Sequence, residues 1–368
     1  MEKRRPALRE ILSCVVFVAV IGVLFVLNIV LPVPDVLVAE RRIPAKFPEL
    51  TPDSVFSGTF MSKFEDYAAD NFVFRDAFRE VHSFMVFDLY MQRDMSGLYR
   101  SRNIGLGEFR RTDAAAFRLS AQKVHNAAKS LDSYDMNIYY SLIPDKSVFA
   151  EFYMPGFDYS LAEGILGDVM GSYTYISLGE ILSGPDYYRT DLHWNQTKIA
   201  GVADHLLSSM GAEPGLGDSP VALAGEFFGL YAGQLALPVD ADVLSYRDIP
   251  GLRVSYLNEK TLENEPGPVY DMERFEGVDP YDIFLRGPQP LIVLENDAAP
   301  ERELYLFRDS FGSSLAPLLT SAYSKITVID LRYVNLMLLP MLIDFTPGSD
   351  VLFIYGSQIF NNPSVLQA

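Results

Sequence analysis

The chain has 368 residues, of which 49% are hydrophobic and 21% are charged, a composition typical of a globular protein with a real core. Its formal net charge of −18 repels nucleic-acid phosphates, so we expect no nucleic-acid partner. The single cysteine, Cys14, excludes an intramolecular disulfide, and with four scattered histidines it offers no ligand cluster, so no metal and no other cofactor is expected.

The N-terminal sequence predicts a membrane anchor. Residues 1–10 form a basic tail, and residues 11–31 are an uncharged apolar run, ILSCVVFVAVIGVLFVLNIVL. About 20 apolar residues span a bilayer, and the positive charges place the tail in the cytoplasm and the rest of the chain outside. A cleaved signal peptide is the alternative, but the run is long and the cleavage site around Ala39 is poor. We expect a single-pass protein of the cell membrane.

Residues 32–52 are rich in proline with mixed charges, which predicts an extended juxtamembrane linker before an extracytoplasmic domain at residues 53–368. The start of this domain has apolar residues at helical spacing, which predicts two amphipathic helices broken near Asn71. Their apolar stripe is expected to be buried core; it includes Phe60, Phe64, Tyr67, Phe74, Phe78, Val81 and Met85.

Helical and strand patterns alternate through most of the remaining chain. Helices are predicted at Thr112–Ser130, Ser313–Tyr323 and Leu336–Phe345, and strands at Asn137–Ile143, Glu303–Phe307, Ile326–Leu331 and Val351–Tyr355. This alternation predicts the α/β class, with a mainly parallel sheet covered by helices on both faces. Residues 225–287 are rich in glycine, proline and short alternating runs, which predicts an insertion of hairpins and loops.

Two stretches carry candidate chemistry, and the first is LYLFRDSFGSSLAPLL around Ser310. A serine between a strand and a helix can expose its hydroxyl above the sheet, where the helix N-terminus offers free N–H groups to an oxyanion. The structural alternative is that Asp309 and Ser310 are ordinary N-cap residues.

The second stretch is YYRTDLHWNQTK at residues 187–198. Asn195 is a typical N-cap for a helix from Gln196 to about Leu207. Asp191, two residues before His193, can place a carboxylate beside the imidazole, where it fixes the tautomer and stabilises the imidazolium. The structural alternative is a histidine–tryptophan packing pair at a helix entry.

Asp191, His193 and Ser310 together supply an orienting acid, a base and a nucleophile. Weaker candidates for substrate or oxyanion contacts, each with an equally plain structural alternative, are Tyr188 and Arg189 beside the histidine motif, Lys146 after the strand at 137–143, and Arg332 and Tyr333 after the strand at 326–331.

TDLHW resembles the TDHHW signature of the DHHW family and the TDTHW of the alginate O-acetylation proteins, which are SGNH-hydrolase-like. Other stretches resemble the same family in consistent order and extend the resemblance over nearly everything after Thr51: NFVFRDAF, SLIPDKSVF, YDIFLRGPQPLIVLEN, and RDSFGSSLAPLL followed by ITVIDLRYVN. The resemblance implies a three-layer α/β/α SGNH-hydrolase-like fold and maps the triad onto Asp191, His193 and Ser310. The serine block comes last, the reverse of ordinary SGNH hydrolases and the same order as in the alginate group.

This chain departs from the family patterns at two positions. Leu192 replaces the first histidine of the DHHW signature, which leaves the triad intact. Arg308 stands where ordinary SGNH enzymes carry glycine before Asp-Ser, so the Ser310 N–H is one expected oxyanion donor and the second is not identified.

The leading interpretation is a membrane-anchored serine acyl-ester enzyme, an O-acetyltransferase or O-acetyl esterase. The resemblance implies that it acts on cell-envelope or exported polysaccharide, with a possible membrane-bound acyltransferase partner. The alternative is a non-catalytic envelope protein that keeps the fold and binds a glycan or a partner protein. Geometry discriminates between them, because the enzyme requires His193 Nε2 near Ser310 Oγ and Asp191 near His193 Nδ1.

Overall fold

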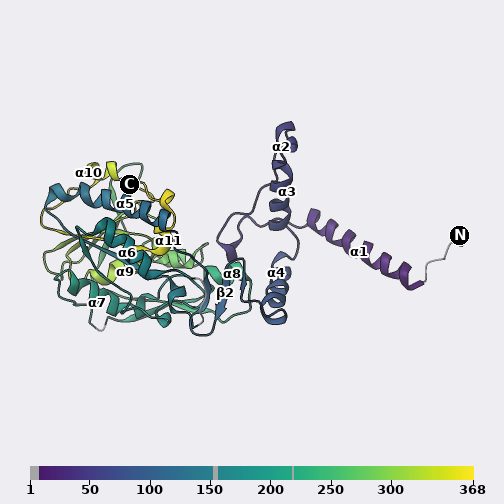
Figure 1. Ribbon diagram of the computed structural model, residues 1–368, viewed down its shortest axis with the longest axis horizontal. Coiled ribbons are helices and arrows are strands. Elements are labelled where there is room, and N and C mark those ends of the chain that lie inside the picture. Colours follow the sequence, from purple (N-terminus) through teal and green to yellow (C-terminus); the bar gives the residue numbers. More distant parts are fainter. Residues whose placement is uncertain (1–7, 152–155, 218) are drawn as a thin grey trace. The chain divides into compact units, whose positions relative to one another are not determined.

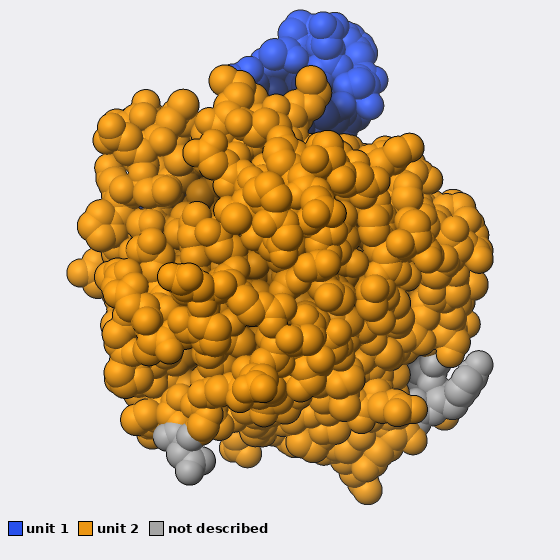
Figure 2. All heavy atoms as spheres, turned by 90° about the vertical axis from the view of Figure 1, so that its left-hand side faces the viewer, with its two compact units in different colours: residues 1–91, 234–238 blue, residues 92–233, 239–368 orange. Residues whose placement is uncertain are grey.

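The computed structural model describes residues 8–151, 156–217 and 219–368. Most of the predicted basic tail, including Lys3, Arg4 and Arg5, lies outside the described residues. The chain divides into two compact units, which are residues 1–91 with 234–238 (unit 1) and residues 92–233 with 239–368 (unit 2) (Figure 2).

Unit 1 is helical. Its first helix, α1 (Leu8–Val30), has 23 residues, none of them buried, and contains an 18-residue window with a mean hydropathy of 2.8, so it is long and apolar enough to cross a membrane (Figure 1). The other helices are α2 (Pro52–Phe56), α3 (Thr59–Asp70) and α4 (Arg75–Phe84), followed by a π-helical turn at Met85–Leu89.

The predicted break near Asn71 is confirmed, because Asn71 ends α3 and its side-chain amide donates to the Tyr67 carbonyl at 2.8 Å. The prediction that the apolar stripe is buried was wrong for α4. Phe74, Phe78 and Val81 each expose more than half of their surface, at 58%, 52% and 57%. Helical periodicity shows that apolar side chains share a face, but it does not show what covers that face.

Unit 2 is built on an eight-stranded sheet in the order β5-β4-β13-β11-β12-β10-β8-β9. The strands are β4 (Asn137–Ile143), β5 (Thr174–Tyr175), β8 (Arg253–Leu257), β9 (Asn264–Gly267), β10 (Leu291–Glu295), β11 (Glu303–Arg308), β12 (Lys325–Ile329) and β13 (Asp350–Gly356). Pairing is parallel from β5 to β12 and antiparallel from β12 through β10 and β8 to β9. The sheet is therefore mainly parallel, as predicted.

Helices cover both faces of this sheet (Figure 1). In β11, Leu304 and Leu306 belong to the hydrophobic core shared with α7 (Ala200–Ser209) and α9 (Ser310–Leu319). Tyr305 and Phe307, which alternate with them, belong to the core shared with α5 (Ala114–Ser130) and α6 (Tyr159–Met170). Side chains of a strand alternate between faces, so β11 is buried on both sides and the fold is the predicted three-layer α/β/α type.

Smaller elements complete the unit. They are the three-stranded antiparallel sheet β1 (Asp94–Met95), β2 (Leu98–Ser101) and β3 (Gly105–Glu108), the antiparallel pair β6 (Val221–Phe227) and β7 (Asp242–Arg247), and the short helices α8 (Leu230–Leu235), α10 (Leu339–Leu342) and α11 (Ser357–Phe360). Within the predicted insertion at 225–287, β8 and β9 extend the edge of the main sheet. The insertion and the other domain boundaries stay predictions.

Candidate active site

Ser310 is the first residue of α9 and follows the central strand β11 by two positions. Asp309 is the N-cap, since its Oδ1 accepts the Phe311 N–H at 3.0 Å and its Oδ2 accepts the Gly356 N–H at 2.7 Å. Complete burial raises the pKa of this carboxyl group. Asp309 therefore performs the capping that the structural alternative assigned to both residues, and the Ser310 hydroxyl is directed elsewhere.

The Ser310 hydroxyl meets the histidine of the other motif. Ser310 Oγ lies 2.8 Å from His193 Nε2, and His193 Nδ1 lies 2.7 Å from Asp191 Oδ1. The Asp191 Oδ1 atom also accepts the His193 backbone N–H at 3.0 Å. The structure thus brings together the three predicted side chains in one hydrogen-bonded chain, with Asp191 fully buried and His193 4% exposed.

Asp191 is held from behind by the segment that begins α8. Its Oδ2 accepts the Leu230 N–H at 2.8 Å, and the neighbouring Thr190 hydroxyl accepts the Gly229 N–H at 2.8 Å. A Cβ atom on Gly229 would collide with Asp191, so the close approach of these two backbones requires glycine. On the other side, Asp242 in β7 accepts from the Thr190 backbone and hydroxyl, each at 2.6 Å.

Lys146 lies beneath the same loop. Its ammonium group donates to the carbonyls of Tyr188 at 2.6 Å, Arg189 at 3.2 Å and Asp191 at 3.0 Å. Burial lowers the pKa of Lys146 to about 7, and the carboxylate of Asp191 opposes that shift. The structure therefore places Lys146 as a support for the loop that presents Asp191 and His193.

The imidazole is fixed by rings that the sequence analysis did not single out. Tyr281 stacks on His193 with ring centroids 3.9 Å apart and planes at 7°, and Phe311 packs at 4.9 Å. Burial raises the pKa of the Tyr281 phenol, so its hydroxyl stays protonated and donates to Ser314 Oγ at 2.7 Å. Trp194 Nε1 donates to the same oxygen at 2.8 Å. Tyr281 lies in the family-like stretch YDIFLRGPQP, which was its only sequence signal.

Ser310 also contributes a backbone donor at the start of α9. The Asp309 carboxylate accepts the Phe311 N–H, and the Asp309 carbonyl accepts the Gly312 N–H. Asp309 does not accept the Ser310 N–H, which is the first backbone donor of α9. Free N–H groups in the first turn of a helix stabilise negative charge. The guanidinium group of Arg308 is fully buried and pairs with Asp330 at 3.2 Å, so it is not an exposed cation beside the Ser310 N–H.

The other weaker candidates occupy two places. Arg332 pairs with Asp330 at 2.6 Å, and Tyr333 is 48% exposed. Tyr188 is buried and Arg189 is exposed, and both line a hollow of about 400 Å³ that Asp191, His193 and Ser310 do not line. Their contact with a substrate stays a prediction.

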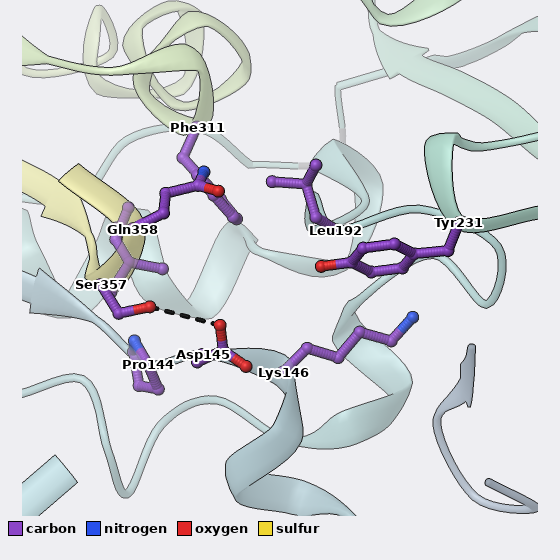
Figure 3. Close-up of a pocket in the computed structure, with 10 residues that line it drawn as sticks. Pro144, Asp145, Lys146, Leu192, Tyr231, Phe311, Ser357 and Gln358 are labelled. Atoms are coloured by element: carbon purple, nitrogen blue, oxygen red, sulfur yellow. Dashed lines mark hydrogen bonds between the residues drawn. The ribbon is translucent and has the colours of Figure 1, made fainter. Parts of the chain in front are cut away.

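A second hollow lies directly beside Phe311 (Figure 3). Its lining includes Lys146, Leu192, Phe311 and Gln358, and its volume of about 10 Å³ has room for about one water molecule. Leu192, which replaces the first histidine of the DHHW signature, therefore lines the same hollow as Phe311, the residue that follows Ser310. Within the described ranges no group of three or more His, Cys, Asp or Glu side chains could hold a metal ion.

No protein-family model and no curated protein matches the sequence. Solved structures do match. A DHHW family protein from Eubacterium siraeum has 16% identity and a TM-score of 0.57, covering 74% of this chain and 94% of that chain. Bacillus cereus PatB1 with a sulfonyl adduct has 15% identity and a TM-score of 0.57, covering 73% and 97%.

The O-acetyltransferase domain of Pseudomonas putida AlgJ is more distant in structure, with a TM-score of 0.41 and 13% identity over 72% of this chain and 92% of that chain. The structural neighbours thus agree with the resemblance seen in the sequence. At these identities they show a shared fold, which is that of the DHHW family protein and PatB1.

Proposed function

We propose that this chain is a membrane-anchored serine acyl-ester enzyme, an O-acetyltransferase or O-acetyl esterase. The observation that carries the proposal is the unbroken hydrogen-bonded chain from Asp191 through His193 to Ser310. Supporting it, the stacked Tyr281 ring and the loop held by Lys146 fix the imidazole before any substrate binds. A fixed base beside a serine hydroxyl is the arrangement that nucleophilic catalysis requires.

The reaction proceeds through an acyl-serine. Ser310 Oγ forms a bond to the carbonyl carbon of an acyl ester while its proton passes to His193 Nε2, and the Asp191 carboxylate stabilises the imidazolium. The Ser310 N–H at the start of α9 donates to the resulting oxyanion. When the tetrahedral intermediate collapses, the leaving alcohol takes the proton from Nε2. A second hydroxyl, from a sugar in a transferase or from water in an esterase, then attacks the acyl-serine and passes its proton to His193 Nε2. The bond between the acyl carbon and Ser310 Oγ breaks, and Oγ takes that proton back from Nε2.

The proposal extends to place and substrate. α1 spans the membrane with its N-terminus in the cytoplasm, so the site faces the outside of the cell. The TDLHW resemblance supports acetyl groups as the cargo and cell-envelope or exported polysaccharide as the acceptor. A membrane-bound acyltransferase is the proposed donor partner.

The test is covalent labelling of the full chain in detergent. PatB1 carries a sulfonyl adduct in its structure, so a sulfonyl fluoride and an activated acetyl ester are suitable probes. Intact-protein mass spectrometry is expected to show one adduct on the native chain and none on Ser310→Ala.

Ser313→Ala is the matched control, because Ser313 lies on the same helix and its hydroxyl has no hydrogen-bond partner among the residues that the structure describes. It is expected to label like the native chain. A folded native chain that takes neither probe would contradict the enzyme proposal.

A further inference from the structure

Unit 1 carries an apolar surface that the proposed chemistry does not use. We define the α4 apolar face as Phe74, Phe78, Val81 and Phe84, which are 58%, 52%, 57% and 55% exposed. Their spacing of three and four residues puts them on one side of the helix. Contiguous exposed apolar surface of this kind marks a contact with a partner or a membrane.

A hydrogen bond joins the residue just before α4 to α1. Asn28 accepts the Val73 N–H with its Oδ1 at 2.9 Å and donates from its amide to the Leu24 carbonyl at 2.8 Å. Asn28 lies in the last turn of α1, which ends at Val30. Val73 directly precedes Phe74, so the start of α4 lies beside the last turn of α1.

The depth of that turn follows from the length of α1. A helix of 23 residues is about 34 Å long, and the hydrocarbon core of a bilayer is about 30 Å thick. If α1 spans, its last turn lies at the boundary between acyl chains and headgroups. The start of α4 then lies at the same level, which is where aromatic side chains of membrane proteins concentrate.

The charges on α4 fit a helix that lies along this boundary. Asp76 and Glu80 project from the side opposite Phe78, and both are exposed. Arg75 and Arg79 pair with Glu40 within unit 1. The polar side of α4 thus presents acidic groups to water, so contact with lipid would come from the apolar side chains rather than from attraction to anionic headgroups.

We propose that the α4 apolar face is embedded in the lipid headgroup and acyl boundary, so that the chain contacts the membrane surface through α4 as well as through α1. This rests on the proposed membrane span of α1. It makes unit 1 an interfacial element whose orientation on the bilayer is set by the Asn28–Val73 hydrogen bond and by the aromatic rings.

Quenching of tryptophan fluorescence by lipids with brominated acyl chains tests the proposal in the full chain. The native protein has one tryptophan, Trp194, which is fully buried and serves as the background to subtract. Three variants are reconstituted into phosphatidylcholine vesicles: Phe78→Trp on the apolar face, Glu80→Trp on the opposite side of α4, and Phe25→Trp within α1.

The expected result is loss of the added emission for Phe78→Trp and Phe25→Trp, and unchanged emission for Glu80→Trp. Quenching of Phe25→Trp alone would overturn the α4 contact while leaving the membrane span in place, and would point to a protein partner or a second copy on that face. No quenching of Phe25→Trp would overturn the span itself and the inference with it. Neither outcome affects the labelling of Ser310, so the enzyme proposal is tested independently by that labelling.

Discussion

The substitution Asp191→Asn tests how the carboxylate acts on His193. Oδ1 accepts the His193 backbone N–H at 3.0 Å and lies 2.7 Å from the ring Nδ1, and Oδ2 accepts the Leu230 N–H at 2.8 Å. An asparagine has a single acceptor oxygen. We expect that oxygen to take the Oδ1 position, because it satisfies two buried donors of His193 there, the backbone N–H and the ring Nδ1–H.

The magnitudes follow from this orientation. Nδ1 keeps its proton and Nε2 stays able to accept from Ser310, so the variant loses the negative charge but not the tautomer. A hydrogen bond to a charged group is worth about 1.5–3 kcal/mol, so the rate of Ser310 acylation falls roughly 10- to 100-fold. The new amide NH₂ faces the Leu230 N–H, and this unsatisfied buried donor costs about 1–3 kcal/mol of folding stability.

The assay is the rate of adduct formation with the activated acetyl ester, measured together with the free energy of unfolding in urea. Asp242→Asn is the control, because Asp242 holds the same loop through Thr190 and does not contact the imidazole. It is expected to lose similar stability and to change the rate far less than Asp191→Asn does.

Two results would refute the reasoning. A fall of about 10⁴-fold would mean that the amide turned its NH₂ toward Nδ1, which imposes the wrong tautomer on His193. A rate equal to that of the native chain would mean that the Asp191 charge does not stabilise the imidazolium.

Three further predictions concern the supports of the fold and site. Lys146→Met leaves the buried carbonyls of Tyr188 and Asp191 without their donor and lowers stability by about 2–4 kcal/mol in thermal unfolding; an unchanged midpoint contradicts this. In Gly229→Ala the added Cβ atom forces the Asp191 backbone away from residue 229, which lowers the free energy of unfolding by about 1–3 kcal/mol and slows Ser310 labelling. Labelling at the native rate contradicts this prediction. Arg42 lowers the pKa of Asp70 from 3.8 to about 2, so Asp70 stabilises the folded chain above pH 3.8 and this contribution is lost as the pH falls toward 2. Asp70→Asn should therefore be less stable than the native chain at about pH 5, with the difference vanishing near pH 2 in thermal unfolding; a pH-independent difference contradicts it.

Local patterns in the sequence determined the elements of the α/β unit. Strand β4 matches its prediction residue for residue, and β11 extends its prediction by Arg308 alone. Asn195 is an N-cap as predicted, with its side chain accepting the Thr197 N–H at 3.0 Å, but it caps a 3₁₀ turn at Gln196–Lys198, and α7 begins separately at Ala200. Strand alternation and capping depend on neighbours within a few residues, so the sequence alone carries them. The apolar helix α1 was predicted for the same reason, because its signal is composition over one continuous stretch.

The site was predicted only in part. Asp191 and His193 are two residues apart, so their proximity is local, and the partnership with Ser310, which is 117 residues from His193, was suggested by the types of residue and by the family resemblance. The stacking of Tyr281 on His193 could not be predicted, because the residues next to a tyrosine in the sequence do not determine which distant ring it contacts in the fold.

Two features were decided by tertiary structure alone. Lys146 was considered as a substrate contact, but the fold closes the loop at Tyr188–Asp191 over its ammonium group and gives it three backbone carbonyls. Phe78 was expected in the core because its spacing is helical, yet it packs against Phe72 and leaves 52% of its surface exposed. Periodicity establishes which side chains share a face of a helix, whereas the packing of distant segments decides whether that face meets protein, water or lipid.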